Sequence, residues 1–106
     1  MLNEVTIIGN AGRDAEPRGD QPFLIMGVAT TESYKQGDGT WKDETVWHNV
    51  KFSNYLFEKA KGIKKGDTLV IKGKFKSYEK EGVRHWQVVA FKLHNLSEQS
   101  RNRSML

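Results

Sequence analysis

The residues whose type and spacing point to chemistry are lysines and aromatic residues, which recur together in several short segments. Between residues 69 and 78, alternation puts Lys72, Lys74 and Lys76 on one face of a strand, with apolar residues on the other. Like charges held this close repel one another, so the arrangement is most favourable when a string of phosphates crosses it and releases counterions. The alternative is that these lysines only solvate an outer face or protect a sheet edge.

A second segment puts an aromatic side chain on a polar strand face. Over residues 45–52, Val46, His48 and Val50 share the apolar side, whereas Trp47 shares the other side with Lys51. An indole beside lysines is commonly a subunit contact or a platform on which a base stacks, and each stacked base contributes roughly 1–3 kcal/mol. The same pairing recurs in the segments Tyr34-Lys35, Trp41-Lys42 and Arg84 with Trp86, although Trp86 fits the core equally well.

Repeated aromatic and cationic pairs are typical of sequence-tolerant binding to single-stranded nucleic acid. Binding to a duplex requires a helix or ribbon shaped for a groove, and the sequence shows neither pattern. The formal net charge of +4 and the isoelectric point of about 9.4 favour a polyanionic partner.

Catalytic and metal sites are not predicted. The chain has no cysteine, and His48, His85 and His94 do not have the spacing of metal ligands. The segment 9–12 (Gly-Asn-Ala-Gly) is not a phosphate-binding loop, because neither Gly-Lys-Ser/Thr nor a helix follows it. We therefore expect a protein that is not an enzyme and needs no cofactor.

The elements that must position these residues form an all-β pattern. Period-two segments predict strands at about 3–9, 22–34, 45–52, 67–78 and 83–93, with loops at 10–21 and 35–44 and a turn at 79–82. Between the third and fourth strands, Asn54 can cap one short helix whose apolar residues are Leu56, Phe57, Ala60 and Ile63. This order predicts a five-stranded Greek-key barrel of the OB type, with a small β-sandwich as the alternative.

The 106 residues are enough for one domain, predicted over residues 1–96, with an unstructured basic tail at 97–106. The sequence has no apolar run of about 20 residues and no signal pattern at its start. We therefore expect a cytoplasmic protein that does not contact membranes.

Several motifs resemble the bacterial-type single-stranded DNA-binding proteins. They occur in the family's order and cover residues 3 to about 96: the opening 3–14 with Glu16 and Arg18, then 29–34 (ATTESY), 45–50 (TVWHNV), 64–67 (KKGD) and 70–73 (VIKG). The resemblance implies an OB fold, assembly into a homotetramer more than a dimer, and single-stranded DNA wrapped over stacking aromatic residues in replication, recombination and repair.

The resemblance also implies roles for individual residues. Tyr34 and Trp47 match base-stacking positions, and Phe52 matches an aromatic position near the DNA, whereas strand alternation puts Phe52 in the core; both readings stay open. His48 matches a histidine near the subunit contact, where we also expect Asn3 and Val5. The predicted stacking residues are thus Tyr34, Trp41, Trp47, Phe52, Tyr78 and Trp86, and the predicted phosphate contacts are Lys35, Lys42, Lys51, Lys72, Lys74, Lys76, Lys80 and Arg84.

The resemblance fails at the C-terminal end, where the family continues into a Gly- and Pro-rich linker with an acidic end. This sequence ends in residues 101–106 (RNRSML), either as a piece of a longer chain or as a tailless relative, so partner recruitment through such a tail is not predicted. Two other functions stay open: an accessory primosome-type OB protein that bridges replication proteins, and a barrel whose aromatic face docks a peptide or another subunit.

Overall fold

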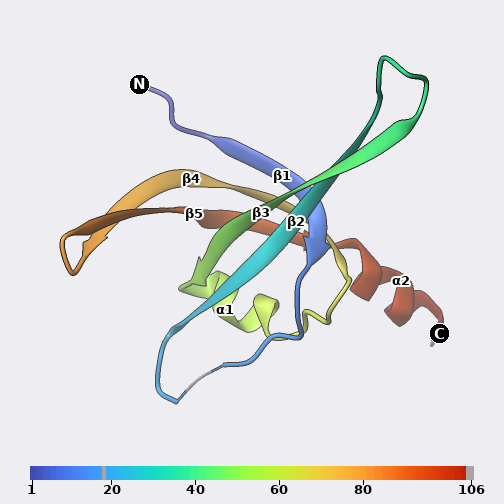
Figure 1. Cartoon of the computed structure of the whole chain (residues 1–106). Helices are drawn as coiled ribbons and strands as arrows, with labels where there is room; N and C mark the ends of the chain where they lie inside the picture. Colours follow the sequence, from blue (N-terminus) through green and yellow to red (C-terminus); the bar gives the residue numbers. More distant parts are fainter. Residues whose placement is uncertain (18, 105–106) are drawn as a thin grey trace.

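The computed structural model describes residues 1–17 and 19–104, in which five strands close into a barrel (Figure 1). The strands are β1 (Val5–Ala11), β2 (Phe23–Lys35), β3 (Trp41–Ser53), β4 (Thr68–Lys80) and β5 (Val83–Asn95), and the helices are α1 (Tyr55–Ala60) and α2 (Leu96–Ser104). The strand order around the barrel is β1-β2-β3-β5-β4, and among these pairs only β3 and β5 run parallel. This confirms the predicted OB-type barrel with a short helix between the third and fourth strands.

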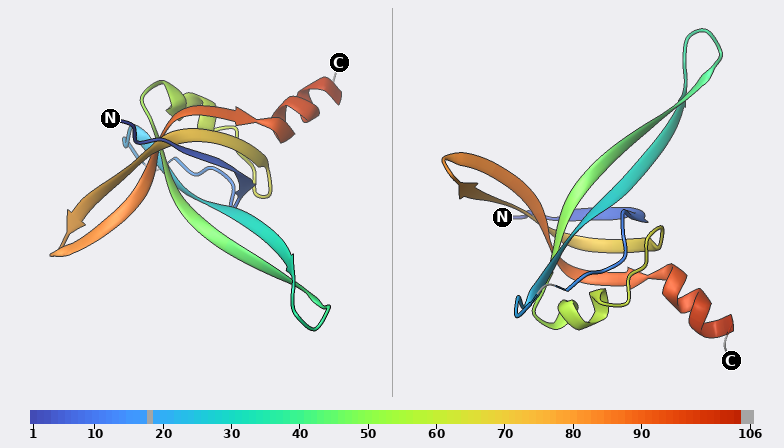
Figure 2. Two further views of the ribbon diagram at one scale, coloured as in Figure 1. Left: turned by 90° about the horizontal axis from the view of Figure 1, so that it is seen from above. Right: turned by 60° about the horizontal axis from the view of Figure 1, so that its bottom comes forward.

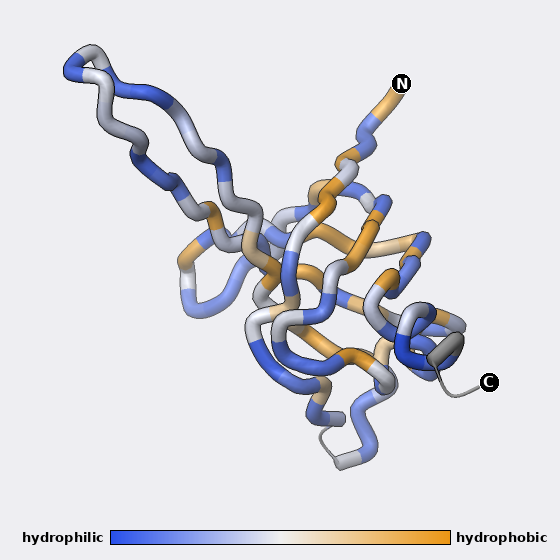
Figure 3. The backbone as a smooth tube through the Cα atoms, turned by 90° about the vertical axis from the view of Figure 1, so that its right-hand side faces the viewer, coloured by the Kyte–Doolittle hydropathy of each residue, from blue (hydrophilic) through white to orange (hydrophobic). Residues whose placement is uncertain are grey.

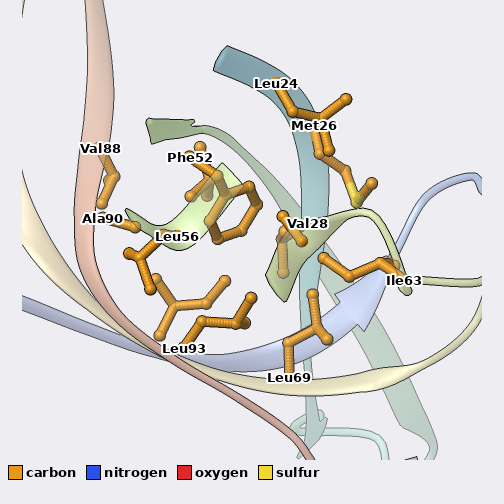
Figure 4. Close-up of a cluster of buried hydrophobic side chains, with 14 of the residues drawn as sticks. Leu24, Met26, Val28, Phe52, Leu56, Ile63, Leu69, Val88, Ala90 and Leu93 are labelled. Atoms are coloured by element: carbon orange, nitrogen blue, oxygen red, sulfur yellow. The ribbon is translucent and has the colours of Figure 1, made fainter. Parts of the chain in front are cut away.

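The core is built from alternate residues of the strands, as the period-two pattern predicts (Figure 4). Val28, Val50 and Leu69 are completely buried there. Helix α1 adds Leu56 and Ala60 to the core, and Asn54 occupies its N-cap position, although the Asn54 side chain makes no capping hydrogen bond. Burial of the apolar side of the helix, rather than its cap, therefore stabilises it.

Two hairpins, β2–β3 and β4–β5, extend beyond the barrel and diverge as separate arms (Figure 2). The β2–β3 arm is mostly hydrophilic, whereas apolar residues concentrate in the barrel body (Figure 3). The predicted loop 35–44 shortens to residues 36–40, because β2 and β3 pair as far as Lys35 opposite Trp41. Polar cross-strand pairs extend the ladder, including a 3.1 Å hydrogen bond between the Thr31 and Thr45 hydroxyls. Trp41 is thus the first residue of β3 and not a loop residue.

Helix α2 replaces most of the unstructured tail that the sequence predicted from residue 97; residues 105–106 lie outside the described part of the chain. The Asn95 side chain caps the helix by accepting a 2.9 Å hydrogen bond from the Glu98 backbone N–H. Asn95 also donates to the buried Asp67 carboxylate at 2.9 Å, and Arg101 donates two hydrogen bonds to the same carboxylate at 2.7 and 3.0 Å. Long-range polar contacts, which local composition does not reveal, therefore fix this helix.

Replacing Asp67 by Asn is expected to lower the free energy of unfolding by about 2 kcal/mol at neutral pH, because hydrogen bonds to a charged, buried group are lost. The hydrogen bonds from Arg101 hold the pKa of the Asp67 carboxyl well below its ordinary value of 3.8. A depressed folded-state pKa stabilises the fold above pH 3.8, and this contribution is lost as the pH falls further. Urea titrations should therefore show the difference between wild type and D67N shrinking in acid, and a constant difference would contradict this role.

No helix within residues 1–17 and 19–104 is long and apolar enough to cross a lipid bilayer.

Candidate nucleic-acid interface

The surface of β3, β5 and β4 that points away from the core is here called the outer face. Lys51 of β3 pairs with Val89 of β5, and Val89 pairs with Lys74 of β4. Residues paired across strands point to the same side of a sheet, so Lys51 and Lys74 share the outer face. Alternation along each strand adds the remaining members. The outer face carries Trp47, Lys51, Lys72, Lys74, Lys76 and Tyr78.

Trp47 is well exposed and lies against a wall formed by two glycines. Its side chain is 63% exposed. A Cβ atom on Gly12 would come within 2.8 Å of Trp47 Cζ3, and one on Gly27 within 3.4 Å of Trp47 Cε3. The indole therefore packs on bare backbone on one side while much of its surface faces solvent. A ring fixed in this way loses little conformational entropy when a base stacks on it.

A groove of about 490 Å³ continues from this surface between the β1–β2 loop and the tip of the β4–β5 arm. Phe23 and Ile25 of β2 line it, and the Lys51 ammonium lies 4.5 Å from the centre of the Phe23 ring. Arg13 donates a hydrogen bond of 2.5 Å to the Ile25 carbonyl, which holds its guanidinium at the groove. The groove residues are Arg13, Glu16, Gln21, Phe23, Leu24, Ile25 and Lys80. An apolar floor with cations on both sides suits a flexible, negatively charged chain.

Some predicted contacts lie on the opposite side of the arms. Trp86 shares the side of the buried Val88, and it is 61% exposed because the arm leaves the barrel there. Its ring meets Phe75 edge-on at 6.5 Å. Tyr34 pairs with Lys42 on the corresponding side of the β2–β3 arm. Strand alternation therefore keeps Tyr34, Lys42, Arg84 and Trp86 off the outer face, although Trp86 and Trp47 line one pocket of about 220 Å³ where the two arms diverge.

Phe52 is completely buried, so the prediction that it stacks on DNA is wrong and the alternation that placed it in the core is right. The remaining predicted residues lie along the two arms. Trp41 and Lys35 pair at the tip of the β2–β3 arm, and Tyr78 stacks on His85 with ring centres 5.2 Å apart. Arg84 donates to the Ser77 hydroxyl at 2.8 Å, which already uses part of its hydrogen-bonding capacity.

The predicted subunit-contact residues have internal partners in this chain. Asn3 forms two hydrogen bonds with the Phe75 backbone, at 2.8 and 3.2 Å, and so extends the pairing of β1 with β4. His48 Nε2 lies 2.9 Å from the Thr30 hydroxyl, and Val5 pairs with Gly73. Their contact with a second copy stays a prediction.

Sequence reasoning missed three aromatic residues at this surface. Phe23 and Phe91 fall inside predicted strands and Tyr55 follows the predicted helix cap Asn54, so the sequence pattern assigns none of them a role at the surface. Tyr55 is 74% and Phe91 40% exposed. The sequence did contain a signal for Tyr55. It comes directly before Leu56, the first residue of α1 that faces the core, and so it lies on a different side of the helix. Within the described ranges, no group of three or more His, Asp or Glu side chains is placed to hold a metal ion.

Several known proteins are similar to this chain in sequence. The chain is 36% identical over 77 residues to the mitochondrial single-stranded DNA-binding protein of Drosophila melanogaster, covering 69% of this chain and 53% of that protein. It is 32% identical to single-stranded DNA-binding protein 1 of Xylella fastidiosa, covering 95% of this chain and 82% of the relative. The chain thus spans about half the length of the fly protein.

Solved structures of other proteins have the same barrel fold as this chain. A Plasmodium falciparum SSB in complex with ssDNA superposes with a TM-score of 0.72 at 16% identity, covering 91% of this chain and 96% of that one. A small single-stranded DNA-binding protein from Streptomyces coelicolor gives 0.69 at 19% identity, covering 92% and 97%. The model of the single-strand binding protein family matches residues 2–93, which include every strand of the barrel except the last two residues of β5. The chain therefore belongs to the single-strand binding protein family.

Proposed function

We propose that this protein binds single-stranded DNA without sequence preference and performs no reaction on it. Residues 1–96 are the binding domain, and the outer face with the adjoining groove is the path of the strand. Bases stack on Trp47, and phosphates lie over the lysines of β3 and β4. The bound protein shields exposed strands during replication, recombination and repair, in the cytoplasm at the nucleoid.

One observation carries this proposal: an exposed, fixed indole shares a face with four lysines from two strands. The lysines are Lys51, Lys72, Lys74 and Lys76. Family membership supports the same function, because relatives that match most of this chain are named as single-stranded DNA-binding proteins.

The test measures the affinity for a fluorescently labelled oligothymidine at a series of salt concentrations, with fluorescence anisotropy as the readout. Each phosphate contact to a single strand contributes a slope of about 0.7 in log affinity against log salt. If four lysines contact phosphates, affinity should fall with a slope of nearly 3. A duplex of the same length is the control and should bind much more weakly. A flat salt response, or equal affinity for the duplex, would contradict the proposal.

The proposal includes a homo-oligomer, with a tetramer favoured over a dimer. The side of the arms opposite the outer face supports it, since Val46, Phe75 and Trp86 are all at least 45% exposed there. Sedimentation velocity, with and without an oligonucleotide, gives the number of copies directly. A monomer at all concentrations would remove this part of the proposal and leave DNA binding untouched.

A further inference from the structure

A second pocket opens on the outer face at the base of the β4–β5 arm. Its volume is about 230 Å³, below the roughly 300 Å³ of the smallest drug-sized sites, so it suits one base or one sugar-phosphate unit. The walls come from the end of β3, the start of α1, β4 and β5. The lining residues are Ser53, Asn54, Tyr55, Lys74, Lys76, Val89, Ala90 and Phe91.

Tyr55 gives this pocket an aromatic ring that is both exposed and held in place. The side chain is 74% exposed. Its hydroxyl nevertheless donates a hydrogen bond to the backbone carbonyl of Phe91. The hydrogen bond fixes the far end of the ring against β5. The ring is thereby ordered before any ligand arrives, which lowers the entropic cost of stacking on it.

An irregularity in β5 accounts for the position of Phe91. Lys72 pairs with Lys92, but the next residue of β4, Gly73, pairs with Ala90, so Phe91 is an extra residue in β5. Such a bulge bends a strand and redirects its side chains. As a result Phe91 is 40% exposed and its carbonyl is available to Tyr55. Tyr55 and Phe91 therefore both line the pocket.

The charges of the pocket favour an anion. Lys74 and Lys76 line it, and the part of its lining that the structure describes contains no aspartate or glutamate. Lys74 belongs to the outer face as well, beside Val89 and Lys51. Trp47 lies four residues before Lys51 in β3, about 13 Å along the strand. A chain of phosphates that leaves Trp47 and passes Lys51 thus reaches the pocket within a few nucleotides.

We propose that this pocket is an additional nucleotide subsite, in which a base stacks on Tyr55 and its phosphate lies between Lys74 and Lys76. This inference rests on the proposed function, because it extends the path of the same single strand beyond Trp47. It assigns a base contact to a residue at the start of α1 rather than to a strand of the barrel.

The test compares wild type with Y55L and Y55F on oligothymidines of increasing length. Y55L removes the aromatic face and keeps a bulky apolar side chain, whereas Y55F keeps the face and loses only the hydroxyl. We expect the affinity ratio of wild type to Y55L to be near one for the shortest oligomers that bind and to rise to about tenfold for longer ones. Y55F should stay within about threefold of wild type at every length. Thermal melts check that both variants stay folded.

Three results would overturn the subsite. A wild-type to Y55L ratio near one at all lengths shows that Tyr55 is outside the path, and it leaves the proposed function intact. A Y55F defect as large as that of Y55L assigns the effect to the hydrogen bond rather than to stacking. Failure of wild type to bind any oligothymidine removes both the subsite and the proposed function. Photocrosslinking of a 5-iodouracil oligonucleotide to the peptide that contains Tyr55 would directly support the contact.

Discussion

Replacing Trp47 by alanine is expected to weaken binding to an oligothymidine by about 5- to 150-fold, the range that corresponds to one lost base stack. The indole is 63% exposed and rests on Gly12 and Gly27, so its removal opens no cavity in the core. The loss should therefore appear in binding and not in stability. Titration by intrinsic fluorescence should also show that W47A loses most of the quenching that DNA causes in wild type.

Trp86 provides a matched control for this experiment. It has the same side chain and nearly the same exposure, 61%, but it belongs to the core side of its strand, although it and Trp47 line one pocket of about 220 Å³ where the arms diverge. If sedimentation shows that W86A keeps the oligomeric state of wild type, this variant should retain most of the quenching and change affinity by less than W47A does. If W47A keeps the wild-type quenching, the stacking role passes to Trp41 or Trp86, and the path across the outer face is wrong.

The parts of the fold that were predictable from sequence are those that local periodicity specifies. A residue buried on one side of a strand forces its neighbours to the other side, so the separation of Val50 and Phe52 from Trp47 and Lys51 follows from order alone. The same rule placed Lys72, Lys74 and Lys76 together. The family resemblance was less exact. It predicted that Phe52 lies near the DNA, whereas the Phe52 side chain is completely buried.

The parts that were not predictable depend on contacts between distant residues. Helix α2 has little apolar character of its own, and its order depends on Asp67 and Asn95, which precede Arg101 by 34 and 6 positions in the sequence. Periodicity also cannot reveal an extra residue in a strand. The bulge at Phe91 interrupts the alternation of β5 and creates the carbonyl that Tyr55 binds. Both features change which side chains are exposed on the surface of the barrel.

The arms show a related limit. Alternation assigns each residue of a long hairpin to one of two sides, but it does not tell where the hairpin leaves the barrel. Val46, Phe75 and Trp86 lie on the core side of their strands and are nevertheless exposed, because the arms diverge before those positions. An aromatic residue on the core side can thus become a surface residue, which is why Trp86 fitted both interpretations.

Removing the three charges of β4 with K72Q, K74Q and K76Q is expected to have the other large effect. Each lost phosphate contact should reduce the slope of log affinity against log salt by about 0.7, so the triple variant should lose about 2 from the wild-type slope. The loss of affinity should be greatest at low salt and should shrink as salt rises, because counterion release drives this term. Anisotropy at a series of salt concentrations measures both quantities.

A second triple variant separates local contacts from net charge. Lys61, Lys64 and Lys65 are exposed after the end of α1 and line neither the Tyr55 pocket nor the groove, so the triple variant K61Q, K64Q and K65Q removes the same charge elsewhere. If the slope reports specific phosphate contacts, this control should keep nearly the wild-type slope. If both triple variants lose the same slope, only the overall positive charge of the chain attracts DNA. The lysines of β4 would then solvate the sheet, as the alternative interpretation of their alternation holds, and the strand would have to follow another path.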